Sequence, residues 1–310
     1  MSDNERARRR ERRIGLVYML GAYACWGVVM PVYLKALKGV PVFEILAHRV
    51  VWATLFALML IAALGRFGEM RRVLAPRTLR LLLISAALVT ANWVIYIVAV
   101  TSDRIVEASL GYFMNPLVSV ALGMAALGER LRRLQVAACS VAALGIVLLA
   151  ASSEGVPWIS LALAFSFGLY GLVRKVVAVE ALAGFTFEAM LLTPLATGYL
   201  LFLAAEGESS FVAAAPLRDA LLMGAGIVTA LPLIWFAAGT RKLPLTVVGV
   251  LQFLSPCATF ILGVFVYGEP FSRGEAACFA AIWLALALYI TDALGARHRA
   301  AALAVGRGAD

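Results

Sequence analysis

The sequence has few of the residues on which most enzyme and metal chemistry depends. Its 310 residues include only two histidines and four cysteines, and 18 acidic residues stand against 27 Lys and Arg. No HExxH or GxSxG motif is present, and no aspartate pair lies within an apolar stretch. The cysteines lie singly, without the paired spacing of a zinc site or a redox dithiol, at Cys25, Cys139, Cys257 and Cys278. We therefore expect no catalytic residue, no metal and no cofactor, and predict that the protein is not an enzyme.

Long polar segments are scarce as well. The chain is 63% hydrophobic with a mean hydropathy of +0.93, whereas a soluble domain is about 45 to 50% apolar. A spanning helix needs about 20 predominantly apolar residues, so the chain has room for ten spans and short loops but for no soluble domain. We predict an all-α polytopic membrane protein with ten transmembrane helices. The apolar runs cover residues 14–37, 43–64, 79–100, 106–127, 134–151, 156–173, 184–205, 217–238, 245–267 and 275–291.

The basic residues are distributed unevenly between the connections of these ten spans. Of the 27 Lys and Arg, 21 lie in the tails and alternate connections on one side, five lie on the other side, and Arg49 lies inside a span. Cytoplasmic loops of membrane proteins are enriched in Lys and Arg. We therefore predict a multi-pass protein of the bacterial cytoplasmic (inner) membrane with both termini cytoplasmic. The net charge of +9 also fits nucleic-acid binding, but charges that flank apolar runs argue against that partner.

An internal repeat relates the two halves of the chain. Residues 107–150 match residues 247–290 at a constant offset of 140, which aligns Pro116 with Pro256. Each half contains five spans, an odd number, so the halves must have opposite orientations, as in many secondary transporters. The predicted organisation is a cytoplasmic basic tail, a first five-helix repeat, a second five-helix repeat and a cytoplasmic tail, over residues 1–13, 14–152, 153–293 and 294–310.

The two aligned prolines lie near the centres of spans four and nine. Proline lacks a backbone donor and disturbs the bond to the carbonyl four residues earlier, here that of Tyr112 and that of Gln252. We predict that Pro116 and Pro256 are helix breaks and that Tyr112 and Gln252 line a solute cavity. The alternative is that the small residues on these faces allow close helix packing and that the prolines only bend the helices.

Three titratable side chains, Glu44, His48 and Arg49, lie near the start of the second span. Because a charge at the bilayer centre costs about 2.5 to 3.5 kcal/mol on insertion scales, Arg49 should face the bundle interior, where it could bind a substrate carboxylate or pair with Glu44. Glu188 matches Glu44 in the repeat, and these two carboxylates could couple transport to protons or could each cap a helix N-terminus. His48 could relay protons or could simply be hydrogen-bonded.

The remaining cavity candidates are polar or aromatic side chains within spans. Such groups suit an amphipathic solute, while interhelical hydrogen bonding and plain packing are the alternatives. These candidates are Trp26, Asn92, Tyr96, Asn115 and Trp235.

Two parts of the sequence resemble the RarD branch of the EamA family, within the drug/metabolite transporter superfamily. In the first half the likeness is carried by Glu44, Leu46, Ala47, His48 and Arg49 and by Ala108, Ser109, Leu110, Gly111, Tyr112, Asn115, Pro116, Gly128 and Glu129. In the second half it is carried by Thr229, Ala230, Leu231, Pro232, Gly249, Gln252, Ser255, Pro256, Gly268, Glu269 and Pro270. The likeness extends over nearly all of residues 15–291.

This resemblance implies a ten-helix inner-membrane permease that exports metabolites or drugs. It also implies a cavity between spans one to four and six to nine, with spans five and ten peripheral. We therefore predict a secondary, alternating-access transporter of a small organic metabolite or drug, with a passive solute channel as the alternative. The expected partners are a small-molecule solute and the lipid bilayer; nucleic acid is not expected, and a homodimer is left open.

Overall fold

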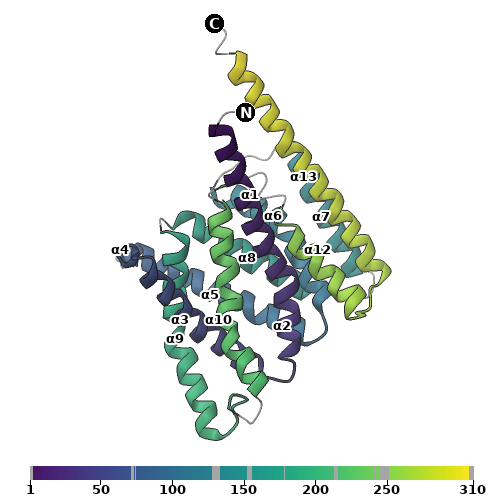
Figure 1. The fold of residues 1–310 in the computed structure, drawn as a ribbon. Helices are drawn as coiled ribbons and strands as arrows, with labels where there is room; N and C mark the ends of the chain where they lie inside the picture. Colours follow the sequence, from purple (N-terminus) through teal and green to yellow (C-terminus); the bar gives the residue numbers. More distant parts are fainter. Residues whose placement is uncertain are drawn as a thin grey trace.

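The computed structural model describes residues 3–70, 73, 75–127, 133–151, 156–177, 179–212, 216–240, 242–243 and 251–306. Every regular element in this part of the chain is helical (Figure 1). In the first half the elements are α1 (Asp3–Ala24), the π-helical turn η1 (Cys25–Val29), α2 (Met30–Ala36), α3 (Val42–Ala63), α4 (Phe67–Met70), α5 (Pro76–Thr101), α6 (Ile105–Leu127) and α7 (Arg133–Leu149). In the second half they are α8 (Trp158–Val176), α9 (Ala181–Glu206), α10 (Pro216–Thr240), α12 (Leu254–Ile261), the π-helical turn η4 (Leu262–Val266) and α13 (Arg273–Gly306).

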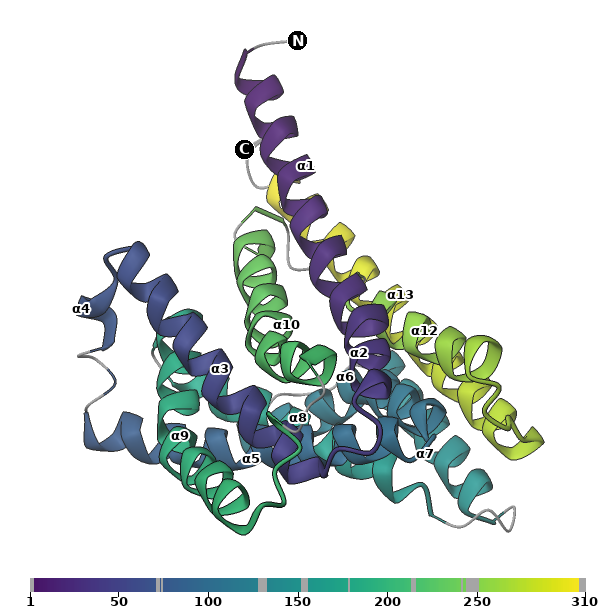
Figure 2. The same ribbon diagram turned by 60° about the horizontal axis from the view of Figure 1, so that its bottom comes forward.

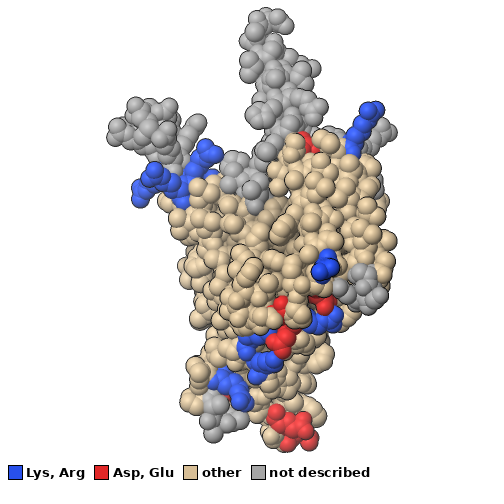
Figure 3. Space-filling view, turned by 90° about the vertical axis from the view of Figure 1, so that its right-hand side faces the viewer, with Lys and Arg blue, Asp and Glu red and all other residues tan. Residues whose placement is uncertain are grey.

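Several of these helices are long and apolar enough to cross a membrane. Within the described residues there are six such segments, at Arg10–Ala36, Val42–Ala63, Pro76–Thr101, Leu182–Glu206, Pro216–Phe236 and Arg273–Asp292, and three shorter apolar helices, at Arg133–Leu149, Trp158–Arg174 and Leu254–Val266. Large apolar side chains also cover the outside, including Leu195 and Phe265, each 75% exposed. Figure 3 shows a broad face that is largely free of charge between charged ends. A surface of this kind suits lipid, which confirms the prediction of an all-α polytopic membrane protein.

The two ends of the chain approach the same end of the molecule. The start of α1 and the end of α13 point the same way in Figures 1 and 2. Both helices are longer than the predicted spans, because α1 begins at Asp3, within the arginine-rich segment, and α13 continues to Gly306. The ninth predicted span is described only from Leu251 onward, where a turn at Gln252 and Phe253 precedes α12.

Helices that are distant in sequence pack together throughout the bundle. α3 packs against α9 and α10, α6 against α8 and α12, α5 against α8, and α1 against α10, while α7 and α13 form a pair at one side (Figure 1). Small residues allow the closest approaches. A Cβ added to Gly27 would lie 2.7 Å from the Ser255 carbonyl oxygen, and one added to Gly111 would lie 2.7 Å from that of Ser160. Close backbone contact of this kind is the usual way in which membrane helices associate.

Candidate functional site

Arg49 lies on α3 in the interior of the bundle, with 6% of its surface exposed. Its Nε donates a hydrogen bond of 2.8 Å to Thr229 Oγ1 on α10. Its guanidinium carbon lies 4.5 Å from the centre of a Trp93 ring on α5, a distance typical of a cation–π contact. Nη1 is buried and has no hydrogen-bond partner in the described part of the protein. The guanidinium therefore has a polar and an aromatic neighbour but retains a free donor.

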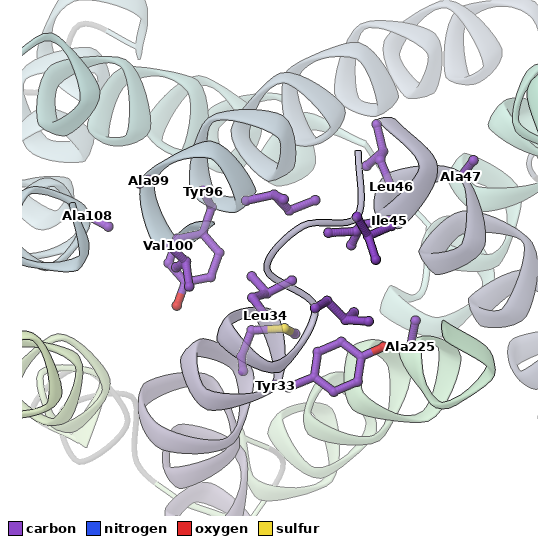
Figure 4. Packing of buried hydrophobic residues seen from close by; sticks show 14 of the residues in the cluster. Tyr33, Leu34, Ile45, Leu46, Ala47, Tyr96, Ala99, Val100, Ala108 and Ala225 are labelled. Carbon is purple, nitrogen blue, oxygen red and sulfur yellow. The ribbon is translucent and has the colours of Figure 1, made fainter. Parts of the chain in front are cut away.

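Three tyrosines from different helices surround this guanidinium. Tyr33 on α2, Tyr96 on α5 and Tyr112 on α6 are close enough to interact with it electrostatically. Figure 4 shows Tyr33 reaching toward α10 near Ala225, with Tyr96 entering the same packed region from α5. The Tyr33 hydroxyl donates to the Leu221 carbonyl, and the rings of Tyr96 and Tyr112 meet edge to face with their centroids 5.7 Å apart. Arg49, Trp93, Tyr33, Tyr96, Tyr112 and Thr229 are called the Arg49 cluster below.

Glu44 and His48 face a different part of the protein, the connection between α9 and α10. Glu44 is fully buried, and its Oε1 accepts a 2.7 Å bond from the Ser210 backbone N–H and a 3.2 Å bond from Ser209 Oγ. The His48 ring lies 4.8 Å from that of Phe211. Glu44 Oε2 and His48 Nε2 are buried without a hydrogen-bond partner among the described groups. Glu44 is therefore held by this connection rather than by Arg49.

Glu188 has a cation as its neighbour. It lies on α9 with 2% exposure, and its Oε1 accepts a 2.6 Å bond from Ser85 Oγ on α5 and a 3.4 Å bond from Arg174 Nη1 on α8. Because α9 begins at Ala181, Glu188 lies about two turns inside the helix rather than at its N-terminus. Its contacts therefore join α5, α8 and α9.

Asn92 and Tyr112 form hydrogen bonds between three helices. Asn92 is 1% exposed; its Nδ2 donates to the Leu163 carbonyl at 3.2 Å and to Ser166 Oγ at 3.0 Å, both on α8. Its Oδ1 accepts a 3.2 Å bond from the Tyr112 hydroxyl. Asn115 lies near Gly168 of the same helix. Asn92 therefore makes the interhelical hydrogen bonds that the sequence left as an alternative to solute contact.

Trp26 and Trp235 both lie where α1 and η1 meet α10. The Trp26 ring lies in η1, 5.7 Å from that of Phe236 on α10, and the Trp235 ring lies against Gly21 of α1. Gln252 is exposed in the turn before α12. Among the described residues no hydrogen bond joins Gln252 to Tyr112, and their shared role in a cavity remains a prediction.

Two further prolines, Pro31 and Pro232, were not predicted as helix breaks. Each of them frees a backbone carbonyl that a side chain of another helix contacts. Pro31 leaves the carbonyl of Gly27 without its usual donor, and this oxygen accepts a 3.2 Å bond from Thr259 Oγ1 on α12. Pro232 does the same for Val228, whose carbonyl lies 3.9 Å from the Cys25 thiol. The rule applied to Pro116 and Pro256 would have identified both. By contrast, α6 is one continuous helix through position 116, whereas Pro256 lies three residues after the turn at Phe253.

Charged residues gather at the end of the bundle opposite the chain termini. Lys35 and Lys38 both bond to Asp103, and these hydrogen bonds hold the pKa of the Asp103 carboxyl down at about 2. Any stability from this pairing is therefore complete above about pH 4 and is lost only as the pH falls through about 2. Glu269 accepts a 2.9 Å bond from the Val106 backbone N–H and so caps α6.

The helical architecture and apolar spans define a multi-pass membrane protein. Comparison with known proteins gives the family. Residues 13–151 match the EamA-like transporter family. Protein RarD of Streptomyces exfoliatus is 41% identical, over 94% of this chain and 93% of that protein. An uncharacterized transporter of Bacillus subtilis, YojE, is 40% identical over 90% and 94% of the two chains.

The chain therefore belongs to the EamA-like transporter family, as a RarD-type permease. The family resemblance predicted from the sequence is thus confirmed. A more distant relative, the chloramphenicol-sensitive protein RarD of Pseudomonas aeruginosa, is 33% identical over 84% of this chain and 88% of its own. A crystal structure of a protein with 20% identity matches the fold with a TM-score of 0.56, over 89% of this chain and 97% of that one. The protein is a membrane transporter of the drug/metabolite type.

Proposed function

We propose that the protein is an alternating-access carrier that exports a small organic metabolite or drug across the bacterial inner membrane. In this proposal ten spans form two inverted five-helix halves, the first over residues 14–152 and the second over residues 153–293. The solute site lies between the halves at the Arg49 cluster. A passive channel is the alternative function.

The observation that carries this proposal is the reciprocity of the helix contacts. In the repeat, α1 corresponds to α8, α3 to α9 and α5 to α10. Exchanging these partners converts the α1–α10 contact into the α8–α5 contact and the α3–α10 contact into the α9–α5 contact. All four contacts occur. The same exchange leaves the α3–α9, α6–α12 and α7–α13 pairs unchanged, and these also occur. A contact pattern that survives the exchange supports two related halves, which can rock against each other about a central site.

The buried carboxylates support a role for protons in this cycle. Glu44 lies one turn from His48 and has no ion pair with Lys or Arg among the described groups, while Glu188 lies beside Arg174. Neutralising Glu44 would break no ion pair, whereas neutralising Glu188 would remove the charge that faces Arg174. We therefore assign proton coupling to Glu44, with His48 as the neighbouring relay, and assign Glu188 a structural role.

The topology has a direct test by cysteine labelling. In a variant from which the four native cysteines have been removed, a cysteine at Glu208 should react with a membrane-impermeant maleimide in intact cells. A cysteine at Gly68 should react only after permeabilisation, because the side rich in Lys and Arg is cytoplasmic. The two positions lie in connections at opposite ends of the bundle. Labelling of both from the same side would contradict the topology.

Transport itself can be tested without knowing the solute. Proteoliposomes loaded with the small-molecule fraction of a bacterial extract should lose a small set of solutes faster than empty liposomes, as measured by mass spectrometry. For each such solute, unlabelled solute outside should accelerate efflux of labelled solute, because a carrier must return its site across the membrane. Efflux that neither saturates nor responds to outside solute would favour the channel.

A further inference from the structure

Arg49 carries a buried charge without a counter-ion. Only 6% of the surface of Arg49 is exposed, its electrostatic neighbours are the three tyrosines, and no carboxylate pairs with it in the described part of the chain. The Tyr33 and Tyr112 hydroxyls donate their protons elsewhere, to the Leu221 carbonyl and to Asn92. An isolated charge in a low-dielectric interior is costly unless something neutralises it.

Glu44, the nearest acid in sequence, is unsuited to this task for a geometric reason. Five residues along an α-helix correspond to a rotation of about 140°, so Glu44 and Arg49 project from nearly opposite faces of α3. Accordingly, Glu44 bonds to Ser209 and Ser210, and Arg49 bonds to Thr229. The structural pair between Glu44 and Arg49 is therefore absent from this conformation.

The internal repeat indicates that the fold itself does not require a positive charge at the position of Arg49. The offset that aligns Glu44 with Glu188 aligns Arg49 with Thr193. Thr193 is neutral and shares a 2.9 Å hydrogen bond with Thr54 across the α3–α9 contact. The second half thus builds the equivalent position with a small neutral residue, which leaves the arginine of the first half available for a ligand.

We propose that the Arg49 cluster is the anion subsite of the carrier and that its solute is an organic monoanion with a carboxylate and an apolar, preferentially aromatic, body. This inference rests on the proposed transport function. Nη1 supplies a free charge-assisted donor for the carboxylate. A single positive charge balances a monoanion but not a doubly charged phosphate. Trp93 and the tyrosines offer ring surfaces for the apolar body.

Equilibrium binding to purified protein tests this subsite. The probes are acetate, hexanoate, benzoate and 3-phenylpropanoate, each compared with its uncharged amide, and binding is measured as ligand-induced thermal stabilisation in detergent. We expect the carboxylates, with benzoate and 3-phenylpropanoate foremost, to bind at least tenfold more tightly than their amides. If no carboxylate binds more tightly than its amide, the proposal is overturned.

Substitutions of Arg49 separate a binding role from a structural one. Arg49→Gln should abolish the preference for carboxylates while leaving the unliganded protein as stable as the wild type or more so, since an unneutralised buried charge is removed. Persistence of the carboxylate preference in Arg49→Gln would overturn the proposal. So would a large loss of unliganded stability, because that result would assign Arg49 to the fold.

A second variant keeps the test decisive if Arg49→Gln does not fold. Trp93→Leu removes the ring beside the guanidinium and leaves the charge, so benzoate affinity should fall at least fivefold while hexanoate affinity changes little. Equal effects on both probes would refute the aromatic part of the subsite. Because binding is measured without flux, intact binding without transport would count against the carrier and not against this subsite.

Discussion

Replacing Gly226 by alanine should lower the thermal unfolding temperature of the purified protein by several degrees. A Cβ at this position of α10 would lie 2.4 Å from both the backbone carbon and the carbonyl oxygen of Trp52 on α3. Because carbon atoms pack at about 3.5 to 4.0 Å, α10 must move away from α3 by about 1 Å. Overpacking costs about 1 to 3 kcal/mol, and because this clash is with backbone atoms, the cost should lie toward the upper end and outweigh the gain of about 1 kcal/mol from replacing a helical glycine.

Gly224 provides the matched control on the same helix. A Cβ there would meet nothing within 4 Å, so Gly224→Ala should leave the unfolding temperature unchanged or raise it slightly. Gly226→Ala should also weaken ligand binding at the Arg49 cluster, because Thr229 lies one turn along α10 and its bond to Arg49 spans the same contact. Equal stabilities of the two variants, measured by scanning fluorimetry in detergent, would show that α3 and α10 are not this closely packed.

Replacing each of the two buried glutamates by glutamine should lower the stability of the protein in one case, at Glu188, and leave it unchanged in the other, at Glu44. Glu188→Gln removes the charge that faces Arg174 and should cost about 1 to 3 kcal/mol of stability. This is less than the roughly 3 to 5 kcal/mol for a fully buried pair, because the Arg174 side chain is 16% exposed. Glu44→Gln resembles the protonated carboxyl in shape and has no Lys or Arg partner to lose, so stability should hold.

Flux driven by a pH gradient should be more sensitive to Glu44→Gln than to Glu188→Gln, which is the reverse of the order expected for stability. If Glu44 carries the coupling proton, Glu44→Gln should reduce solute flux driven by an imposed pH gradient about tenfold or more, while exchange of solute for solute continues. Glu188→Gln should retain gradient-driven flux in the fraction that folds. Both measurements use the same proteoliposomes. Gradient-driven flux that survives in Glu44→Gln and disappears in Glu188→Gln would transfer the coupling role to Glu188.

Helix positions follow closely from the sequence. The apolar run predicted at residues 43–64 corresponds to α3 at Val42–Ala63, and that at 106–127 corresponds to α6 at Ile105–Leu127. Local properties decide these bounds, because a span needs a certain length of apolar side chains whatever lies beside it. The helix ends outside the apolar runs were less predictable, because hydropathy indicates where the lipid-facing segment ends and not where the helix ends. Both α1 and α13 continue beyond their apolar runs.

The candidate site was predicted only in part. The sequence singled out Arg49 because a charge inside an apolar run is conspicuous, and it named Tyr96 and Tyr112, which lie around the guanidinium. It missed Trp93 and Tyr33, because aromatic residues are frequent in such spans and nothing local distinguishes one that faces a charge from one that faces lipid.

The sequence by itself determined that this protein is a helical membrane protein, where most of its spans lie, and which family it resembles. These properties depend on side-chain hydropathy and residue order along the chain. Only the tertiary structure decided which groups meet. In the structure Arg49 contacts Thr229 and Trp93, whereas Glu44 bonds to Ser209 and Ser210, although the two charged residues are only five positions apart. The reason is rotational: neighbours on one helix project from different faces, and the packing of α3 against α9 and α10 determines what each face contacts.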